Sequence, residues 1–327
     1  MKRILQLILL GISMFGLAGC GISENREIQA GSERQLEDSA KIDVTEQISS
    51  EKAQSKDNNS PDIGENEGTE AERDVEELLN AEGMTLETRV RAPEGYTRIP
   101  AEEGSLAAFL RSYPLKEAES PVLLYNGREK GNQGAHAAVF TLPIENEDLQ
   151  QCADSIMRVY AEYFYQTGQY DRISFHFVNG FQADYVKWRE GYRIVVNGND
   201  VSWVSSAAAD ESYESFQEYL RIVFAYAGTL SMEAEAQEIT LEEIQVGDVF
   251  LKGGSPGHVV LIVDVCEKED GSKAFLLGQG YMPAQEFHLL KNPQHGEDPW
   301  YYEEEVTYPF STPEYTFLEG SLCRLDY

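Results

Sequence analysis

The sequence is poor in basic residues. Of its 327 residues, 26 are Lys or Arg and 57 are Asp or Glu, which gives a formal net charge of −31. Binding to a nucleic-acid backbone needs clustered Lys and Arg side chains that release counterions from the phosphates. Because a chain of this charge is repelled by such a polyanion, we expect no nucleic-acid partner.

Cysteine is also scarce, with four residues in the whole chain. That number is too small for a disulfide scaffold. The sequence contains no HExxH motif, no CxxC pair, no P-loop and no GxGxxG. Since these motifs supply the usual zinc ligands and phosphate cradles, we predict no metal and no cofactor.

The longest apolar run stands at the N-terminus, where two basic residues precede residues 4–15 and the motif LAGC ends at Cys20. This pattern resembles a bacterial lipoprotein signal. The resemblance implies that residues 1–19 are removed and that a lipid on Cys20 anchors the mature chain to a membrane outside the cytoplasm. The alternatives are an ordinary cleaved signal, or a membrane span, for which the run falls short of the roughly 20 residues required.

Aromatic residues are missing from the next segment. Residues 21–80 contain 17 acidic and 6 basic side chains and no aromatic one. Such a composition cannot bury enough apolar surface to offset the loss of chain entropy. We therefore predict a disordered acidic tether over residues 20–80.

Residues 81–327 have the composition of a folded domain, since all 18 tyrosines and all 3 tryptophans lie after position 95. Apolar periodicity predicts helices that begin at Ser105 and at Asp148, the latter ending at Gly168, and another over 214–230. Strands are predicted over residues 121–127, 135–144, 173–181 and 192–196, and in a run from 248 to 280. Helices before a sheet-rich C-terminal half indicate one α+β domain.

The segment GDVFLKGGSPGHVVLIVDV, followed by LLGQGY, carries the clearest motif. It resembles the C-terminal half of CHAP and NlpC-type cysteine hydrolases, papain-like domains that cleave amide bonds in cell-wall peptides. The resemblance implies a papain-like core, with a helix that carries Cys and a C-terminal antiparallel sheet. It also implies that His258 is catalytic and that Gln279, early in the next strand, is the third member of the site.

The residues around His258 support this role independently. The run VVLIVDV is apolar on both faces, which is typical of a buried central strand, and His258 stands where that strand leaves a glycine turn. A histidine at the rim of a rigid sheet is well placed as a general base. The alternative is a structural histidine at a strand end.

Cys152 matches the nucleophile that the resemblance requires, near the N-terminus of a predicted helix. The helix dipole and free N–H groups at such a position lower a thiol pKa. The alternative is a small buried residue, because Cys152 shares a helical face with Ile156 and Val159. The 106 positions between Cys152 and His258 also require an insertion relative to compact hydrolases.

Other His and Cys residues remain as candidates. His288 could replace Gln279 as third member of the site, whereas His136 and His176 are interpreted as core histidines. Cys266 and Cys323 either form a disulfide or are buried separately.

Several stretches, including FLRSYPLK, DLQQCADSIMRVYAEY, FAYAGTLSM and YMPAQEFHLLKNP, resemble domain of unknown function 4846, a family of secreted bacterial proteins. Our functional hypothesis is a cysteine amidase or peptidase acting on a peptide amide, with peptidoglycan peptide as substrate. Cys152 would attack the carbonyl, His258 would transfer the proton and Gln279 would orient the imidazole or support the oxyanion. The alternatives are a non-catalytic extracytoplasmic binding or assembly module with the same fold, or activity on another amide or thioester.

Overall fold

The computed structural model describes residues 78–327, which fall within one compact unit. The predicted signal over 1–19, Cys20 and nearly all of the tether predicted for 20–80 lie outside the described residues. Within the described part of the chain, no helix is both long enough and apolar enough to cross a membrane.

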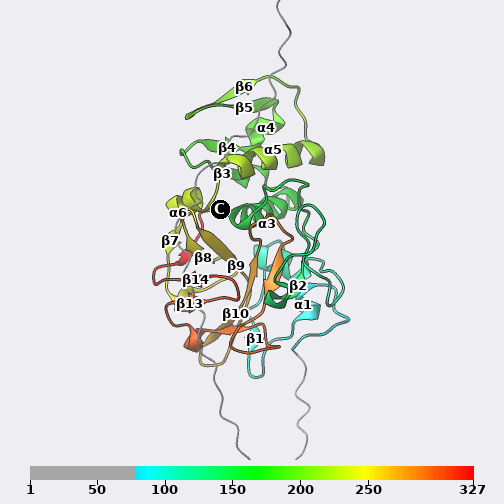
Figure 1. Ribbon diagram of the computed structural model, residues 1–327, viewed down its shortest axis with the longest axis vertical. Coiled ribbons are helices and arrows are strands. Elements are labelled where there is room, and N and C mark those ends of the chain that lie inside the picture. The colour runs from blue at the N-terminus through cyan, green and yellow to red at the C-terminus, as the bar shows by residue number, and fades with distance from the viewer. Residues whose placement is uncertain (1–77) are drawn as a thin grey trace, which may run out of the picture. The chain divides into compact units, whose positions relative to one another are not determined.

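A nine-stranded antiparallel sheet forms the centre of the domain (Figure 1). Along its main path the strands are β2 (His136–Val139), β11 (His288–Leu290), β10 (Lys273–Gln279), β9 (His258–Glu267), β8 (Val249–Lys252), β15 (Leu322–Arg324) and β7 (Gln237–Glu238). Two short strands, β1 (Thr97–Arg98) and β12 (Tyr301–Tyr302), pair with β9 and β10. Together with the helices, this sheet confirms the predicted α+β class and the antiparallel C-terminal sheet.

The helices are α1 (Leu86–Arg89), α2 (Leu106–Ser112), α3 (Cys152–Gln166), α4 (Tyr185–Arg189), α5 (Tyr213–Tyr226) and α6 (Thr229–Glu235). The predicted start of α2 at Ser105 is confirmed, because Ser105 is the N-cap and its hydroxyl accepts a hydrogen bond from the N–H of Ala108. The predicted end of α3 is also confirmed, since the helix stops before Gly168, whose φ of 72° suits glycine.

The predicted N-cap of α3 is wrong. Gln151, not Asp148, caps this helix, and Cys152 is its first residue. The Asp148 carboxylate instead accepts hydrogen bonds from the backbone N–H of Ala284 and from the side chain of Gln151. A tertiary contact has therefore taken the side chain that local sequence assigned to the cap.

The segment between α3 and α6, for which the resemblance predicts an insertion, folds into hairpins and helices. The hairpins β3 (Ser174–His176) with β4 (Gln182–Asp184) and β5 (Tyr192–Asn197) with β6 (Asp200–Ser205) lie there with α4 and α5, at the end of the domain away from β10 (Figure 1). The strand predicted over 121–127 forms only isolated bridges. His176 is not a core histidine, because its side chain is 40% exposed and paired with Glu235.

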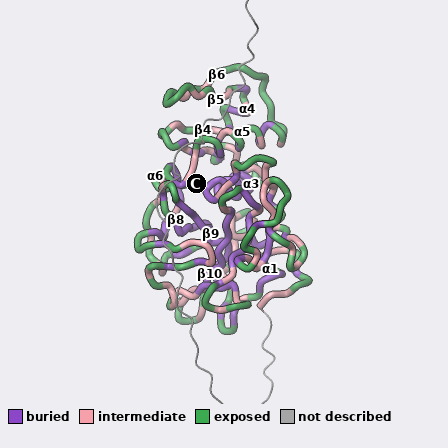
Figure 2. The backbone as a smooth tube through the Cα atoms, in the orientation of Figure 1, coloured by how far each residue is buried: buried purple, intermediate pink, exposed green. Residues whose placement is uncertain are grey.

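Strand β9 is buried on both faces, as the run VVLIVDV predicted (Figure 2). Val259, Leu261 and Val263 belong to one apolar cluster, which also contains Ile156 of α3. Val260 and Ile262 belong to a second cluster, on the opposite face of the strand. Helix α3 thus packs against the face of β9 that carries Val259, whereas His258 lies with Val260 and Ile262 on the other face.

Cys266 and Cys323 are buried separately and both are free thiols. Cys323 of β15 is opposite Val249 of β8, which is in turn opposite Leu261 of β9. Cys266 lies five residues further along β9, roughly 16 Å at 3.3 Å per residue, whereas a disulfide needs Cα atoms within about 7 Å. The strand register therefore separates the two thiols.

Asp264 joins the central strand to the N-terminal part of the domain. Its fully buried carboxylate accepts hydrogen bonds from Nε of Arg98 at 2.6 Å and from Nε of Arg111 at 2.8 Å. Removing one side of a buried ion pair leaves an uncompensated charge.

We therefore expect Asp264→Ala to lower the free energy of unfolding by about 3–5 kcal/mol. Urea unfolding followed by circular dichroism measures this change. Glu304→Ala is the control, because its ion pair with Lys268 is exposed and such pairs contribute about 1 kcal/mol or less. Equal effects of the two substitutions would contradict a structural role for Asp264.

Candidate functional site

A cleft with a volume of about 350 Å³ opens at the N-terminus of α3. Cys152 lines it and is 6% exposed. The opposite wall consists of Gly228 and Thr229, at the start of α6, and the turn 254–257 that leads into β9. Cys152 is therefore a largely buried residue on the wall of this cleft.

His258 and Gln279 are in direct contact. The imidazole Nε2 lies 2.8 Å from Oε1 of Gln279, and both side chains are buried. Gln279 is the last residue of β10, not an early one as predicted. The antiparallel pairing explains this difference, because the end of β10 lies beside the start of β9, where His258 stands.

Cys152 is held close to the same strand end. Backbone groups of Ala153, Cys152 itself and Val259 lie near enough to the thiol to favour its ionised form. Among the contacts of residues 78–327, however, the thiol makes no hydrogen bond to His258. The structure thus joins His258 to Gln279 and places Cys152 beside the residue that follows His258.

Gly280 allows the close approach of β10 and α3. A Cβ atom at this position would stand 2.1 Å from Oγ of Ser155 and 3.1 Å from the carbonyl oxygen of Gln151. Any larger residue would force the start of α3 away from the end of β10. Glycine here keeps the Cys152 end of α3 close to Gln279.

The environment favours a neutral thiol and a neutral imidazole. Burial, assisted by the nearby Asp154 carboxyl, raises the pKa of Cys152 to about 11, although the backbone groups around the sulfur act in the opposite direction. Burial also lowers the pKa of His258 to about 4, despite its hydrogen bond to Gln279. The expectation that the helix N-terminus lowers the thiol pKa is therefore wrong, because desolvation outweighs it.

Asp154 is a second perturbed group on the cleft wall. Burial raises the pKa of this carboxyl to about 8. Its Oδ2 atom accepts a hydrogen bond from the N–H of Gln151, while Oδ1 is buried without a partner. The carboxyl is therefore largely protonated at neutral pH.

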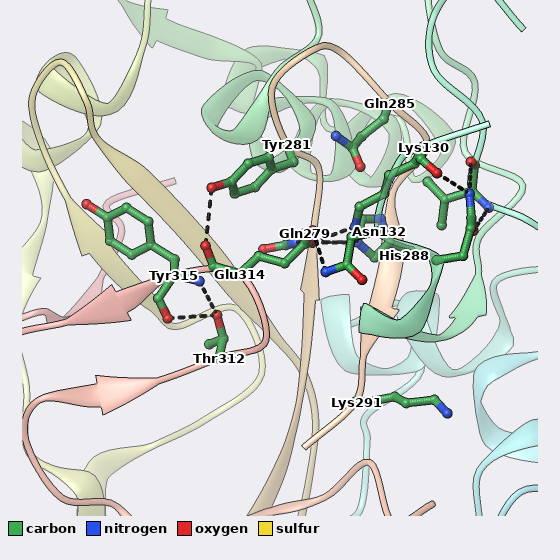
Figure 3. Close-up of polar contacts among 12 residues, drawn as sticks. Lys130, Asn132, Gln279, Tyr281, Gln285, His288, Lys291, Thr312, Glu314 and Tyr315 are labelled. Atoms are coloured by element: carbon green, nitrogen blue, oxygen red, sulfur yellow. Dashed lines mark hydrogen bonds and ion pairs between the residues drawn. The ribbon is translucent and has the colours of Figure 1, made fainter. Parts of the chain in front are cut away.

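A network of buried polar side chains continues from Gln279 (Figure 3). Nε2 of Gln279 donates to Oε2 of Glu314 at 2.7 Å, and Nζ of Lys130 lies 2.5 Å from the same oxygen. Lys130 also contacts Nε2 of His288 at 3.2 Å. Burial alone would raise the pKa of Glu314, but His288 and Lys130 outweigh it and lower the pKa to about 2.

Aromatic rings enclose His258. The ring centroids of Tyr281 and Tyr315 lie 4.8 and 4.9 Å from that of the imidazole, and the Phe317 ring stacks on it at 6.0 Å. These rings exclude water from the imidazole, which accounts for its low pKa.

The sequence predictions identified part of this arrangement. His288 does not contact His258 directly, because Gln279 lies between them. His136 is only half-buried and its Nε2 lies 3.1 Å from the carbonyl oxygen of Ser120. Lys130 and Glu314 were missed, since nothing in their local sequence marks them. Only the fold brings them to Gln279.

Comparison with protein families places the chain. The model of the family described as domain of unknown function 4846 matches residues 86–324. The chain belongs to this family. Cys152, His258 and Gln279 all lie within the matched part of the domain of unknown function. No curated protein and no solved structure gives a match to the chain.

The described residues contain no candidate metal site. Among residues 78–327, no group of three His, Cys, Asp or Glu side chains is arranged to hold a metal ion.

We predict that the alkylation rate of Cys152 rises about tenfold per pH unit between pH 7 and pH 9, because the thiolate is a minor species below its raised pKa. Iodoacetamide labelling followed by mass spectrometry of the Cys152 peptide measures this rate. Cys152→Ser is the labelling control. A rate that is already level below pH 8 would show that the thiol is ionised at neutral pH.

We also predict that Asp154→Asn stabilises the domain at pH 8 by on the order of 2–4 kcal/mol and has little effect near pH 4. Because the folded pKa is above the unfolded one, the native carboxyl retains a proton that the unfolded chain releases, so stability falls as pH rises from about 4 to 8. Urea unfolding at several pH values measures this, with the exposed Asp200→Asn as control. If the difference in unfolding free energy between Asp154→Asn and the parent does not change with pH, the link between Asp154 ionisation and stability is refuted.

Proposed function

We propose that the protein is a cysteine hydrolase that cleaves an amide bond in a peptide, with Cys152 as nucleophile and His258 as general base. The observation that carries this proposal is the hydrogen bond between His258 and Gln279, because the turn that immediately precedes His258 lines the same cleft as Cys152. The order Cys, His, polar residue and the position of each on helix start and strand ends support a papain-like arrangement.

The hydrogen bond to Gln279 occupies Nε2 of His258, so Nδ1 is the nitrogen that we propose as the base. In the proposed reaction, Nδ1 takes the thiol proton as the sulfur of Cys152 bonds to the carbonyl carbon. The imidazolium then gives that proton to the leaving amine as the C–N bond breaks. Water then attacks the thioester carbon while His258 takes a proton from it. The C–S bond breaks as that proton passes to the Cys152 sulfur, which releases the acid and restores the thiol.

A neutral resting pair suits this sequence of steps. The pKa of about 4 keeps His258 unprotonated and able to accept a proton at neutral pH. The thiol loses its proton only as it attacks, so the proton transfer accompanies bond formation. The N–H groups of Cys152 and Ala153, at the start of α3, would stabilise the developing oxyanion.

The cleft lining favours particular peptides. Its acidic residues are Asp148 and the largely protonated Asp154, and no Lys, Arg or His lines it. Exposed apolar side chains of Val178, Leu230 and Met282 stand on its walls. We therefore propose that neutral or cationic peptide segments with apolar side chains bind better than segments rich in carboxylates.

The N-terminal pattern suggests a class of substrate, because it predicts where the protein is located. A lipid on Cys20 would anchor the domain to the cell membrane or outer membrane, outside the cytoplasm, on an acidic tether. Cell-wall peptides carry amide bonds outside the cytoplasm, where the N-terminal pattern predicts the domain. We propose them as the substrate class to test first.

The decisive experiment incubates the purified protein with muropeptides and with neutral apolar peptides, and identifies products by mass spectrometry. We expect hydrolysis by the parent protein and none by Cys152→Ala, because no other nucleophile replaces the thiol. His258→Ala is expected to lower kcat by a factor of about 100 or more.

The matched control is Cys323→Ala, which removes a second buried cysteine that does not line the cleft. It should retain activity. Identical products from the parent and Cys152→Ala would refute the proposed nucleophile. Tight binding of peptidoglycan without any cleavage would instead favour a binding or assembly module.

A further inference from the structure

Glu314 occupies the turn between two short strands, β13 (Phe310–Ser311) and β14 (Thr316–Phe317). The turn is closed by hydrogen bonds between Thr312 and Tyr315. From this turn the Glu314 side chain reaches the buried end of β10, where it meets Gln279 and Lys130 (Figure 3). A group at a hairpin tip thus contacts a residue of the candidate site.

The chemistry of a carboxylate decides how Gln279 is oriented. A carboxylate only accepts hydrogen bonds, and an amide donates through nitrogen and accepts through oxygen. Because Oε2 of Glu314 lies 2.7 Å from the Gln279 side chain, the amide must present its NH₂ group to Glu314. The Gln279 oxygen must then face His258.

The orientation of Gln279 in turn decides the tautomer of His258. The Gln279 oxygen, 2.8 Å from Nε2 of His258, can only accept. The ring therefore carries its hydrogen on Nε2, and Nδ1 keeps its lone pair. A proton on Nδ1 instead would prevent His258 from acting as base through that nitrogen.

His288 supports the same orientation from the other side. Its Nδ1 lies 2.9 Å from the carbonyl oxygen of Glu286, so Nδ1 carries the hydrogen and Nε2 has the lone pair. That Nε2 faces the Gln279 nitrogen at 3.3 Å and the Lys130 ammonium at 3.2 Å. A flipped Gln279 would bring its oxygen against two acceptors, Glu314 and His288.

We propose that Glu314 is a positioning residue that fixes the amide of Gln279 and, through it, holds His258 in the Nε2–H tautomer. Lys130 holds Glu314 in this position, because its ammonium pairs with the Glu314 carboxylate within the buried network. The hairpin tip that carries Glu314 also carries Tyr315, whose ring packs on His258. One loop therefore sets both the tautomer and the position of the imidazole.

The effect of Glu314 on catalysis rests on the proposed function, whereas its effect on the His258 tautomer can be tested without it. The test therefore reads the tautomer directly. Long-range ¹H–¹⁵N spectra of protein labelled at its five histidines distinguish a protonated ring nitrogen from an unprotonated one. The resonances lost in His258→Asn assign the residue.

In the parent protein we expect one tautomer of His258, protonated at Nε2. In Glu314→Gln the new side chain can donate as well as accept, so Gln279 can turn. Both ¹⁵N shifts of His258 should then move toward their average. Should an active substrate be found, kcat is expected to fall about tenfold or more with little change in KM.

Lys116→Met is the matched control, because it breaks another 2.5 Å ion pair, with Glu286, that does not contact Gln279. It should leave the His258 shifts unchanged. If Glu314→Gln does not fold, Glu314→Ala is measured with and without formate, which should restore the single tautomer. An unchanged Nε2–H tautomer in the Glu314 variant overturns the proposal, whereas absent hydrolysis by the parent protein refutes only the proposed function.

Discussion

The antiparallel pairing of β9 with β10 is the constraint on which the rest of the site depends. It brings the first residue of one strand beside the last residue of the other, so that His258 and Gln279 meet although 21 positions separate them. The same two strands offer the surface against which α3 packs, and Gly280 lets the helix start approach closely. This register fixes His258 and Gln279, and the packing of α3 against the same strands fixes Cys152.

Burial gives these residues their chemical character. In the sheet interior the charged form of each group is disfavoured, which raises the pKa of Cys152 and lowers that of His258. Polar groups at this depth need partners, since an unpaired one costs the full loss of hydration. The paired network of Lys130, Glu314 and Gln279 satisfies that need, and Gln279 thereby gains a defined orientation.

The sequence predicted those elements whose signals are local. The apolar run after His258 identified the central strand, because a strand buried on both faces has no polar alternation. Ser105 and Gly168 marked helix ends correctly, since caps depend on neighbours in the chain. The helix start predicted at Asp148 is wrong, because its carboxylate accepts a hydrogen bond from the backbone N–H of Ala284, which is distant in sequence.

The amino-acid sequence by itself determined the α+β class, the buried strand, the family and the residues Cys152, His258 and Gln279 as candidates. Only the tertiary structure decided that Gln279 ends its strand, that Cys266 and Cys323 lie apart, and that Glu314 and Lys130 hold Gln279. It also reversed the expected shift of the Cys152 pKa. The physical reason is common to these cases: periodicity and capping act over a few residues, whereas strand register, desolvation and ion pairing depend on groups brought together from distant parts of the chain.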